Sequence, residues 1–428
     1  MMIETISNLN KSTSFNKSAS FNRRALSSGS PRVSRVGWIS RWYHVFVVIG
    51  FLVSSLVVIS AGYIHLLPGL SLSSHNNGVL KSSYLNETSN GSCNVYEGSW
   101  ILDDSYPLYN ATECPFAEKG FDCLGNGRVD QSYLKWRWKP TDCEIPKLDV
   151  QNVLEMLRSK RIVFVGDSMS RSQWESLICL LMSGVEDKRT VYEINGNKIT
   201  KRIKYLGVRF SSFNFTVEFY RSVFLVQEGQ MPRHSPKRVK SALKLDELDT
   251  ISSQWIDSDV LVFNTGHWWV PGKLFETGCY FQVGHSLKLG MSIPTAFGVA
   301  LRSWASWIEE NINTNRTHVF FRTFEPSHWK DHTFKYCSLT RQPVTDAGDR
   351  VRSIFSDTIL EVAKNMKVPV NILHITSMSA FRSDAHVGKW SDNPSVQDCS
   401  HWCLPGVPDV WNEILLSYLV TEYDASFK

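Results

Sequence analysis

The stretch Arg161–Cys179, RIVFVGDSMSRSQWESLIC, decides the expected fold. An apolar run from Ile162 to Val165 reaches Gly166-Asp167-Ser168, and apolar residues then recur at the spacing of one helical face. The pattern predicts a strand, a tight turn and a helix. A serine at such a junction is exposed beside the N–H groups of the helix start, which stabilise negative charge. Ser168 is therefore a candidate nucleophile; the alternative is that Ser168 or Asp167 only caps the helix.

Apolar strands and amphipathic helices alternate on both sides of this stretch. The expected helices are 150–157, 296–312 and 351–366, and the expected strands are 162–165, 208–215, 217–219, 223–226, 259–265, 318–321 and 368–375. Such alternation predicts an α/β fold whose mainly parallel sheet is flanked by helices. Ligands in these folds bind at the carboxyl ends of the strands. Ser168 lies at one of those ends.

The N-terminal part of the chain has the composition of a membrane anchor. Residues 1–41 are rich in Ser, Asn and Arg and are expected to form a disordered basic cytosolic tail. Residues 42–64 hold an uncharged apolar run of about 20 residues, the length that spans a bilayer. Residues 65–92 are rich in Ser, Asn and Gly and are expected to form a flexible stem. By the positive-inside rule, the rest of the chain is lumenal and the protein is a single-pass type II membrane protein.

The charge balance excludes one class of partner. The tail has seven basic residues and one acid, a net charge of +6, whereas the whole chain has +5, which leaves about −1 for everything after it. Nucleic-acid binding requires a basic surface. A nucleic-acid partner is therefore not expected.

The nine cysteines all follow residue 92. In an oxidising compartment this number predicts four disulfides and one free thiol, whose pairing the spacing does not specify. A zinc site at Cys399, His401 and Cys403 is the alternative, but no second close pair of Cys or His residues completes a four-ligand set, so no metal is expected. Five sequons on the same side are compatible with a glycoprotein: Asn86, Asn90, Asn110, Asn214 and Asn315.

Residues 93–146 are dense in cysteines and aromatic residues and show little periodicity. A segment of this kind buries little apolar surface alone and needs disulfides to fold. Trp100, Trp136 and Trp138 either form its local core or stack on sugar rings. We expect a disulfide-stapled subdomain here, followed by a catalytic domain over residues 147–428.

A second site motif lies near the C-terminus, in Asp398–Asn412, DCSHWCLPGVPDVWN, ahead of a predicted helix. Pro and Gly residues after His401 make the segment a non-helical loop. A serine nucleophile requires a base within hydrogen-bond reach, and a carboxylate that fixes the tautomer of that base. Asp398 and His401 supply both groups. The competing base is His328, which follows a strand together with Arg322 and Glu325.

Four motifs together resemble the plant trichome birefringence-like family. They are GDS at 166–168, NTGHWW at 264–269, FFRTFEPSHW at 320–329 and DCSHWCLPG at 398–406. The resemblance extends from Cys93 to the C-terminus. Members of this family are Golgi polysaccharide O-acetyltransferases related to the GDSL/SGNH esterase fold. The resemblance therefore implies an SGNH-hydrolase-like catalytic domain.

The resemblance also implies roles for individual residues. Ser168 accepts the acetyl group, His401 acts as general base and acid, and Asp398 orients His401. The Ser168 N–H and further donors meet the negative charge of the tetrahedral intermediate. The candidate oxyanion or substrate residues are Asn264, Arg171 and Asp167. The block around Asn264 departs from the G-x-N-D form of the wider fold, so Asn264 alternatively only closes a strand end; the alternative for Arg171 is a solvated helix residue.

The disulfide pairing follows from the same resemblance. It implies Cys93 with Cys143, Cys114 with Cys179, Cys123 with Cys403 and Cys337 with Cys399, and leaves Cys279 free.

The expected activity is acetyl transfer to hydroxyls of a cell-wall polysaccharide of the xylan or pectin class, in the Golgi membrane and in association with other polysaccharide-synthesis proteins. The acetyl donor is acetyl-CoA or a lumenal acetyl carrier acting as co-substrate, no cofactor stays bound, and the sequence has no Gly-rich phosphate-binding loop that favours CoA. The alternatives are an acetylesterase that uses the same three residues with water as acceptor, and a non-catalytic polysaccharide-binding protein.

Overall fold

The computed structural model describes residues 93–331 and 334–426 of the 428-residue chain. The predicted tail (1–41), membrane span (42–64) and stem (65–92) lie outside these residues. Within the described part, no helix combines the length and the apolar character needed to cross a bilayer.

A seven-stranded sheet with the order β13-β12-β9-β3-β6-β5-β4 lies at the centre of the fold. Five of its strands run parallel: β13 (Asn371–Leu373), β12 (His318–Arg322), β9 (Val260–Phe263), β3 (Arg161–Gly166) and β6 (Phe215–Arg221). Two antiparallel strands extend one edge: β5 (Tyr205–Phe210) and β4 (Val191–Glu193). The predicted α/β class with a mainly parallel sheet is confirmed.

The predicted single strand 208–215 is wrong. A 3-10 turn at Ser211–Phe213, followed by Asn214 in the left-handed conformation (φ 59°), reverses the chain between β5 and β6. Asparagine tolerates this conformation better than most residues. The apolar pattern continues through the turn because Phe210 and Phe215 stack across the hairpin, with ring centroids 4.5 Å apart.

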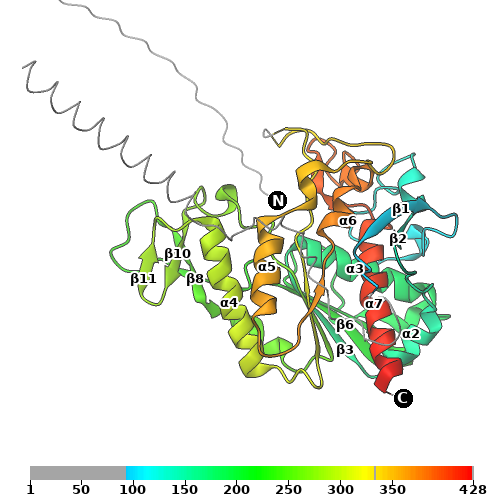
Figure 1. Cartoon of the computed structure of the whole chain (residues 1–428), viewed down its shortest axis with the longest axis horizontal. Coiled ribbons are helices and arrows are strands. Elements are labelled where there is room, and N and C mark those ends of the chain that lie inside the picture. The colour runs from blue at the N-terminus through cyan, green and yellow to red at the C-terminus, as the bar shows by residue number, and fades with distance from the viewer. Residues whose placement is uncertain (1–92, 332–333, 427–428) are drawn as a thin grey trace, which may run out of the picture. The chain divides into compact units, whose positions relative to one another are not determined.

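Helices cover both faces of the central sheet (Figure 1). One layer contains α2 (Val150–Met156), α3 (Ser168–Ser183) and α7 (Val407–Ser426), and the other contains α4 (Ile293–Asn311) and α5 (Ile354–Lys364). Side chains alternate along β3, so that Ile162 and Phe164 join the first core and Val163 and Val165 join the second. Both faces of β3 are therefore buried, which explains its continuous apolar run.

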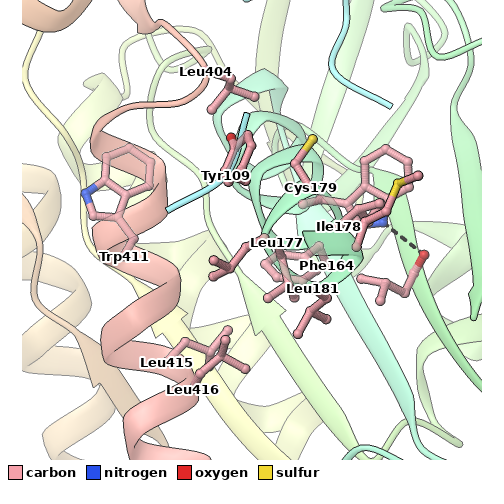
Figure 2. Packing of buried hydrophobic residues seen from close by; sticks show 14 of the residues in the cluster. Tyr109, Phe164, Leu177, Ile178, Cys179, Leu181, Leu404, Trp411, Leu415 and Leu416 are labelled. Carbon is pink, nitrogen blue, oxygen red and sulfur yellow. Dashed lines mark hydrogen bonds between the residues drawn. The ribbon is translucent and has the colours of Figure 1, made fainter. Parts of the chain in front are cut away.

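The helix that begins at Ser168 is held by one of these cores. Figure 2 shows Leu177, Ile178 and Leu181 of α3 in the same packed cluster as Trp411, Leu415 and Leu416 of α7. All six side chains are at most 4% exposed. Burial of a side chain of this size contributes about 1.5–3 kcal/mol. The helix that begins with Ser168 is therefore held in place by the first core.

A second, four-stranded sheet was not predicted. Its order is β11-β10-β8-β7, formed by β7 (Val226–Gln230), β8 (Ser241–Leu248), β10 (Cys279–Val283) and β11 (Ser286–Lys288). The predicted strand 223–226 is wrong except for its last residue, which starts β7. Glu228 and Gln230 of β7 are exposed, so this edge strand lacks the apolar run that marks a buried strand. The short 3-10 helices of the described chain are Ala111–Glu113, Ser132–Lys135, Lys188–Thr190, Ser211–Phe213, Thr250–Trp255, Pro271–Lys273, Gly348–Val351 and Ser383–Ala385.

The Cys- and Trp-rich segment packs through its tryptophans. An antiparallel pair, β1 (Gly98–Leu102) and β2 (Trp136–Pro140), places Trp100 opposite Trp138. Trp138 is buried and donates to the carbonyl of Val95 (2.9 Å), while Trp100 donates to the carbonyl of Met378 (2.8 Å) on α6 (Thr376–Ala380). Trp100 and Trp138 therefore belong to the core, as one of the two sequence interpretations proposed.

Four disulfides join this segment and the C-terminal loops to the domain, and they have the pairing that the family resemblance implied: Cys93–Cys143, Cys114–Cys179, Cys123–Cys403 and Cys337–Cys399. Cys279 is free and buried. Because Cys399 and Cys403 are both oxidised, neither is a thiolate ligand, and the zinc interpretation is wrong.

Glu413 on α7 connects the Cys-rich segment to the main core and predicts a pH dependence of stability. Its two carboxyl oxygens lie 2.7 and 2.8 Å from the Tyr106 hydroxyl. Burial raises the pKa of Glu413 from 4.5 to about 7. The folded protein then holds a proton that the unfolded chain releases, so this contribution to stability is complete below the unfolded pKa and is lost as the pH rises through about 7.

We therefore expect the free energy of unfolding of the native protein to fall between about pH 5 and about pH 8, and the Glu413→Gln variant to lose about 1–2 kcal/mol less over that range. Urea unfolding at the two pH values measures the difference. Parallel losses in the two proteins would show that Glu413 is ionised in the fold.

Candidate active site

Ser168 lies at the point where β3 ends and α3 begins. The Asp167 carboxylate accepts a hydrogen bond from the Met169 N–H (2.9 Å) and caps the helix. The capping role thus belongs to Asp167, while the hydroxyl of Ser168 points elsewhere. Gly166 is needed at the turn because a Cβ there would collide with the side chain and carbonyl of Asn264.

The Ser168 hydroxyl meets His401, 233 residues away in sequence. His401 Nδ1–H donates to Asp398 Oδ2 (2.7 Å), which leaves Nε2 to accept from Ser168 Oγ (2.6 Å). Asp398 Oδ1 accepts from the N–H groups of Ser400 (3.1 Å) and His401 (3.0 Å). Burial raises the pKa of Asp398, but His401 and the two backbone N–H groups outweigh this effect and hold the pKa well below its usual range. The carboxylate is therefore ionised and fixes the tautomer of His401.

The segment that carries Asp398 and His401 is a short strand, not the loop that the prolines suggested. β15 (Asp398–Trp402) pairs antiparallel with β14 (His386–Gly388), and the irregular turn begins only after it. The Cys123–Cys403 and Cys337–Cys399 disulfides hold both ends of β15. Phe121 of the Cys-rich segment packs on the His401 ring, with centroids 5.3 Å apart. Several independent contacts thus restrain the histidine.

The ring of His328, the competing base, is bound to groups other than Ser168. His328 is 2% exposed, and both ring nitrogens have partners: Nδ1 is 2.7 Å from His386 Nε2, and Nε2 is 2.8 Å from the carbonyl of Ala380. Burial lowers the pKa of His328 to about 4. Arg322 and Glu325 are also buried and pair with each other. All three side chains are therefore buried and bound to groups other than Ser168.

Asn264 and Asp167 form a pair beneath the turn. Asn264 Nδ2 donates to Asp167 Oδ1 (3.0 Å), and the Asp167 N–H donates to Asn264 Oδ1 (3.3 Å). Asp167 is fully buried, and its Oδ1 accepts from Met169 and Asn264, so the structure places it beneath the turn; a role toward the oxyanion or substrate stays a prediction. Asn264 is 3% exposed and holds the turn from below.

Arg171 is not the solvated residue of the alternative interpretation. It is buried one turn into α3, forms an ion pair with Glu118 of the Cys-rich segment, and lies 3.3 Å from Glu175. Burial raises the pKa of Glu175 to about 8 although Arg171 opposes the shift. Arg171 therefore joins α3 to the Cys-rich segment at the edge of the site.

A cavity of about 580 Å³ opens over Ser168 and His401. The Cys-rich segment contributes Glu118, Gly120 and Phe121 to its wall, and the main domain contributes the rest, including Lys201, Arg221, Trp268, Trp329, Asp392 and Gln397. None of these lining residues was predicted individually, although Trp268 and Trp329 lie in the NTGHWW and FFRTFEPSHW motifs. Two cysteines could have indicated that residues 118–121 lie at the site, because Cys114 and Cys123 flank these residues. Cys114 is bonded to α3, and Cys123 is bonded to the residue after β15.

This arrangement suits acyl transfer. The imidazole takes the proton of the serine hydroxyl as the hydroxyl attacks a carbonyl, and the ionised carboxylate stabilises the resulting imidazolium. The Ser168 N–H at the start of α3 has no acceptor within the helix and can stabilise the developing oxyanion. Among the described residues, no group of three or more His, Cys, Asp or Glu side chains is arranged to hold a metal ion.

Comparison with known proteins relates this site to acyl-ester chemistry. Residues 145–418 match the model of the GDSL/SGNH-like acyl-esterase family found in Pmr5 and Cas1p, and residues 91–144 match the PMR5 N-terminal domain. The chain is 63% identical to Arabidopsis thaliana trichome birefringence-like 7 over 396 residues, which cover 91% of this chain and 88% of that protein. It is 39% identical to A. thaliana trichome birefringence-like 9 over 395 residues, which cover 88% and 94% of the two chains.

Proposed function

This chain belongs to the trichome birefringence-like family, as its motifs predicted, and carries a GDSL/SGNH-like acyl-esterase domain; from that premise we propose that it transfers an acetyl group to hydroxyls of a plant cell-wall polysaccharide of the xylan or pectin class. The observation that carries the proposal is the hydrogen-bonded series Ser168–His401–Asp398 at the base of an open cavity. Pockets for small-molecule ligands have volumes of about 300–1,000 Å³.

The proposed reaction has two half-reactions. Ser168 Oγ attacks the carbonyl carbon of the donor's acetyl group while His401 Nε2 takes the hydroxyl proton and passes it to the leaving group, which leaves acetyl-Ser168. A sugar hydroxyl then attacks the acetyl carbonyl and gives its proton to His401. The Oγ–acyl bond breaks, the acetylated sugar departs, and His401 returns the proton to Ser168. Asp398 stays ionised throughout and stabilises each imidazolium.

Two groups support charge development in this scheme. The Ser168 N–H at the start of α3 is placed for the oxyanion. Asn264 holds the Asp167 carboxylate that caps the helix, so we propose that it acts by positioning the turn. The wall of charged and aromatic residues suits a carbohydrate, which presents both hydroxyls and apolar C–H faces.

The setting of the reaction is part of the proposal. We propose a single-pass type II protein of the Golgi membrane with a lumenal catalytic domain, acetyl-CoA or a lumenal acetyl carrier as donor, and other polysaccharide-synthesis proteins as partners. The four disulfides of the described chain agree with a lumenal domain because they require an oxidising compartment.

The test incubates the purified full-length protein and its Ser168→Ala variant with an acetyl donor and xylan or pectin oligosaccharides. We expect acetylated oligosaccharide only with the native protein. Net loss of acetyl groups from acetylated oligosaccharides would instead support the esterase. Equal glycan binding by both proteins without any change in ester content would support a binding protein.

A further inference from the structure

The cations in the wall of the cavity differ in their partners. Arg171 pairs with Glu118 and Glu175. Lys201 lies 3.7 Å from Asp392. Arg221 has no carboxylate partner in the part of the chain that the structure describes. Of these three cations, Arg221 is therefore the one without a negatively charged partner among the described residues.

Arg221 has a defined place beside the nucleophile. It is the last residue of β6 and pairs in register with Gly166 at the end of β3. The N–H of the next residue, Ser222, donates to the Gly166 carbonyl (2.9 Å). Since Ser168 follows Gly166 by two residues, the guanidinium projects from the strand end adjacent to the nucleophile's own strand. The backbone of Arg221 is therefore joined directly to the strand that ends at the catalytic turn.

A second cation reinforces the positive charge. Trp268, in the loop after β9, has Arg221 Cζ 5.3 Å and Lys273 Nζ 4.8 Å from its ring. Lys273 also has no carboxylate partner among the described residues. The ring attracts both cations weakly, so two positive charges lie near Trp268, a residue of the cavity wall. An anionic group on a ligand bound there would be attracted by these charges.

We propose that Arg221, assisted by Lys273, binds the carboxylate of an acidic sugar and so selects a uronic-acid-containing acceptor chain. This inference rests on the proposed acetyl transfer and specifies its acceptor. Arg221 uses Nη1 to donate to the carbonyl of Lys201 (3.3 Å). The remaining N–H donors of the planar guanidinium match the geometry of a carboxylate. A neutral polysaccharide would cover Arg221 without pairing its charge, which costs binding free energy.

The carboxylate is a better match here than the phosphates of a nucleotide donor. A pyrophosphate is usually bound by several backbone N–H groups of a Gly-rich loop at a helix start. At the start of α3, the Met169 N–H already donates to the Asp167 carboxylate, which caps the helix. Arg221 provides one guanidinium at one position, which suits a polymer with one carboxylate on each uronosyl residue.

The experiment compares two acceptors with the same sugar backbone: oligogalacturonides, whose carboxyl groups are charged, and the same oligosaccharides after methyl esterification, whose carboxyl groups are neutral methyl esters. kcat and KM for acetyl transfer are measured for the native protein, Arg221→Gln, Arg221→Lys and Lys273→Gln. Arg302→Gln is the control, because Arg302 is an exposed arginine of α4 outside the cavity wall. Binding of both oligosaccharides is also measured by calorimetry in a Ser168→Ala background, which needs no turnover.

We expect the native protein to prefer the acidic acceptor and Arg221→Gln to reduce the acidic-to-esterified ratio of kcat/KM by about 10-fold, mainly through KM. Arg221→Lys should retain part of the preference, Lys273→Gln should lose a smaller part, and Arg302→Gln should behave as the native protein. The calorimetric affinities in the Ser168→Ala background should show the same ratios.

An unchanged ratio in Arg221→Gln, in kinetics or in binding, would overturn the inference while leaving acetyl transfer in place. A second result would also overturn the inference: Arg221→Gln slows acylation of Ser168 by acetyl-CoA but leaves acylation by p-nitrophenyl acetate unchanged. The anion that Arg221 binds would then belong to the donor. If the native protein acetylates neither acceptor, the proposed function fails, and the binding ratio alone decides whether Arg221 recognises an acidic sugar.

Discussion

Replacement of Ser168 by alanine is expected to reduce kcat for acetyl transfer by at least about 10⁴-fold. The reason is that Ser168 Oγ is the atom in line with His401 Nε2, at 2.6 Å, and alanine has no group to carry the acetyl. The fold should be unaffected because the Cβ of alanine fits the same helix position and Asp167 still caps α3. Initial rates with a saturating donor measure the loss, and circular dichroism of the variant checks the fold.

His401→Ala and Asp398→Asn provide the matched comparison. Because the three groups act as one unit, the Ser168→Ala/His401→Ala double variant should be no slower than either single variant. Asp398→Asn should retain hydrogen bonding from the backbone N–H groups but no longer fix the His401 tautomer. Multiplicative losses in the double variant would contradict a common mechanism for Ser168 and His401.

Arg322→Met is expected to destabilise the protein by about 3–5 kcal/mol. Arg322 is fully buried at the end of β12, its Nη1 lies 2.5 Å from Glu325 Oε2, and its Cζ lies 4.5 Å from the centre of the Trp411 ring. Burial raises the pKa of Glu325, but Arg322 and His267 outweigh this effect and hold the pKa below its usual value. Removal of the guanidinium therefore leaves a buried carboxylate whose remaining ion-pair partner among the described residues is His267, 3.3 Å away, which carries a charge only when it is protonated.

The Arg322→Met/Glu325→Gln double variant tests this cause. The double variant lacks the Glu325 carboxylate that Arg322→Met leaves without its guanidinium partner. It should therefore regain a substantial part of the stability that Arg322→Met loses. Urea unfolding of the native protein, both single variants and the double variant gives the coupling free energy. Additive losses would show that the two side chains stabilise the fold independently, contrary to the ion pair described.

The central part of the fold is predictable from the sequence because its signals are local. At Gly166 a continuous apolar run changes to helical spacing, and both core clusters bury the run. The β5–β6 hairpin was missed because Phe210, Phe213 and Phe215 extend the apolar pattern through the turn. The second sheet was missed because the polar residues of its edge strand β7 resemble those of a loop.

The residues of the candidate site also differ in whether the sequence identifies them. Ser168, Asp398 and His401 are chemically distinctive, and the motifs around them resemble a known family, so they were named from the sequence. Arg221 carries no such signal, because its importance depends on β6 being the neighbour of β3, and the order of strands in a sheet is not visible in the chain. The burial of Arg171 likewise depends on Glu118, which reaches α3 only after the Cys-rich segment has folded.

Identification of the acyl-enzyme is the most direct test of the proposed mechanism. The full-length Asp398→Asn variant, which should slow the second half-reaction, is incubated with p-nitrophenyl acetate, quenched with acid, digested and analysed by mass spectrometry. We expect one acetyl group on the peptide that contains Ser168, and loss of that group when acceptor oligosaccharide is added before the quench. An acetyl group on another residue that is transferred to the acceptor, or transfer without any acetyl-Ser168, would contradict the proposed mechanism.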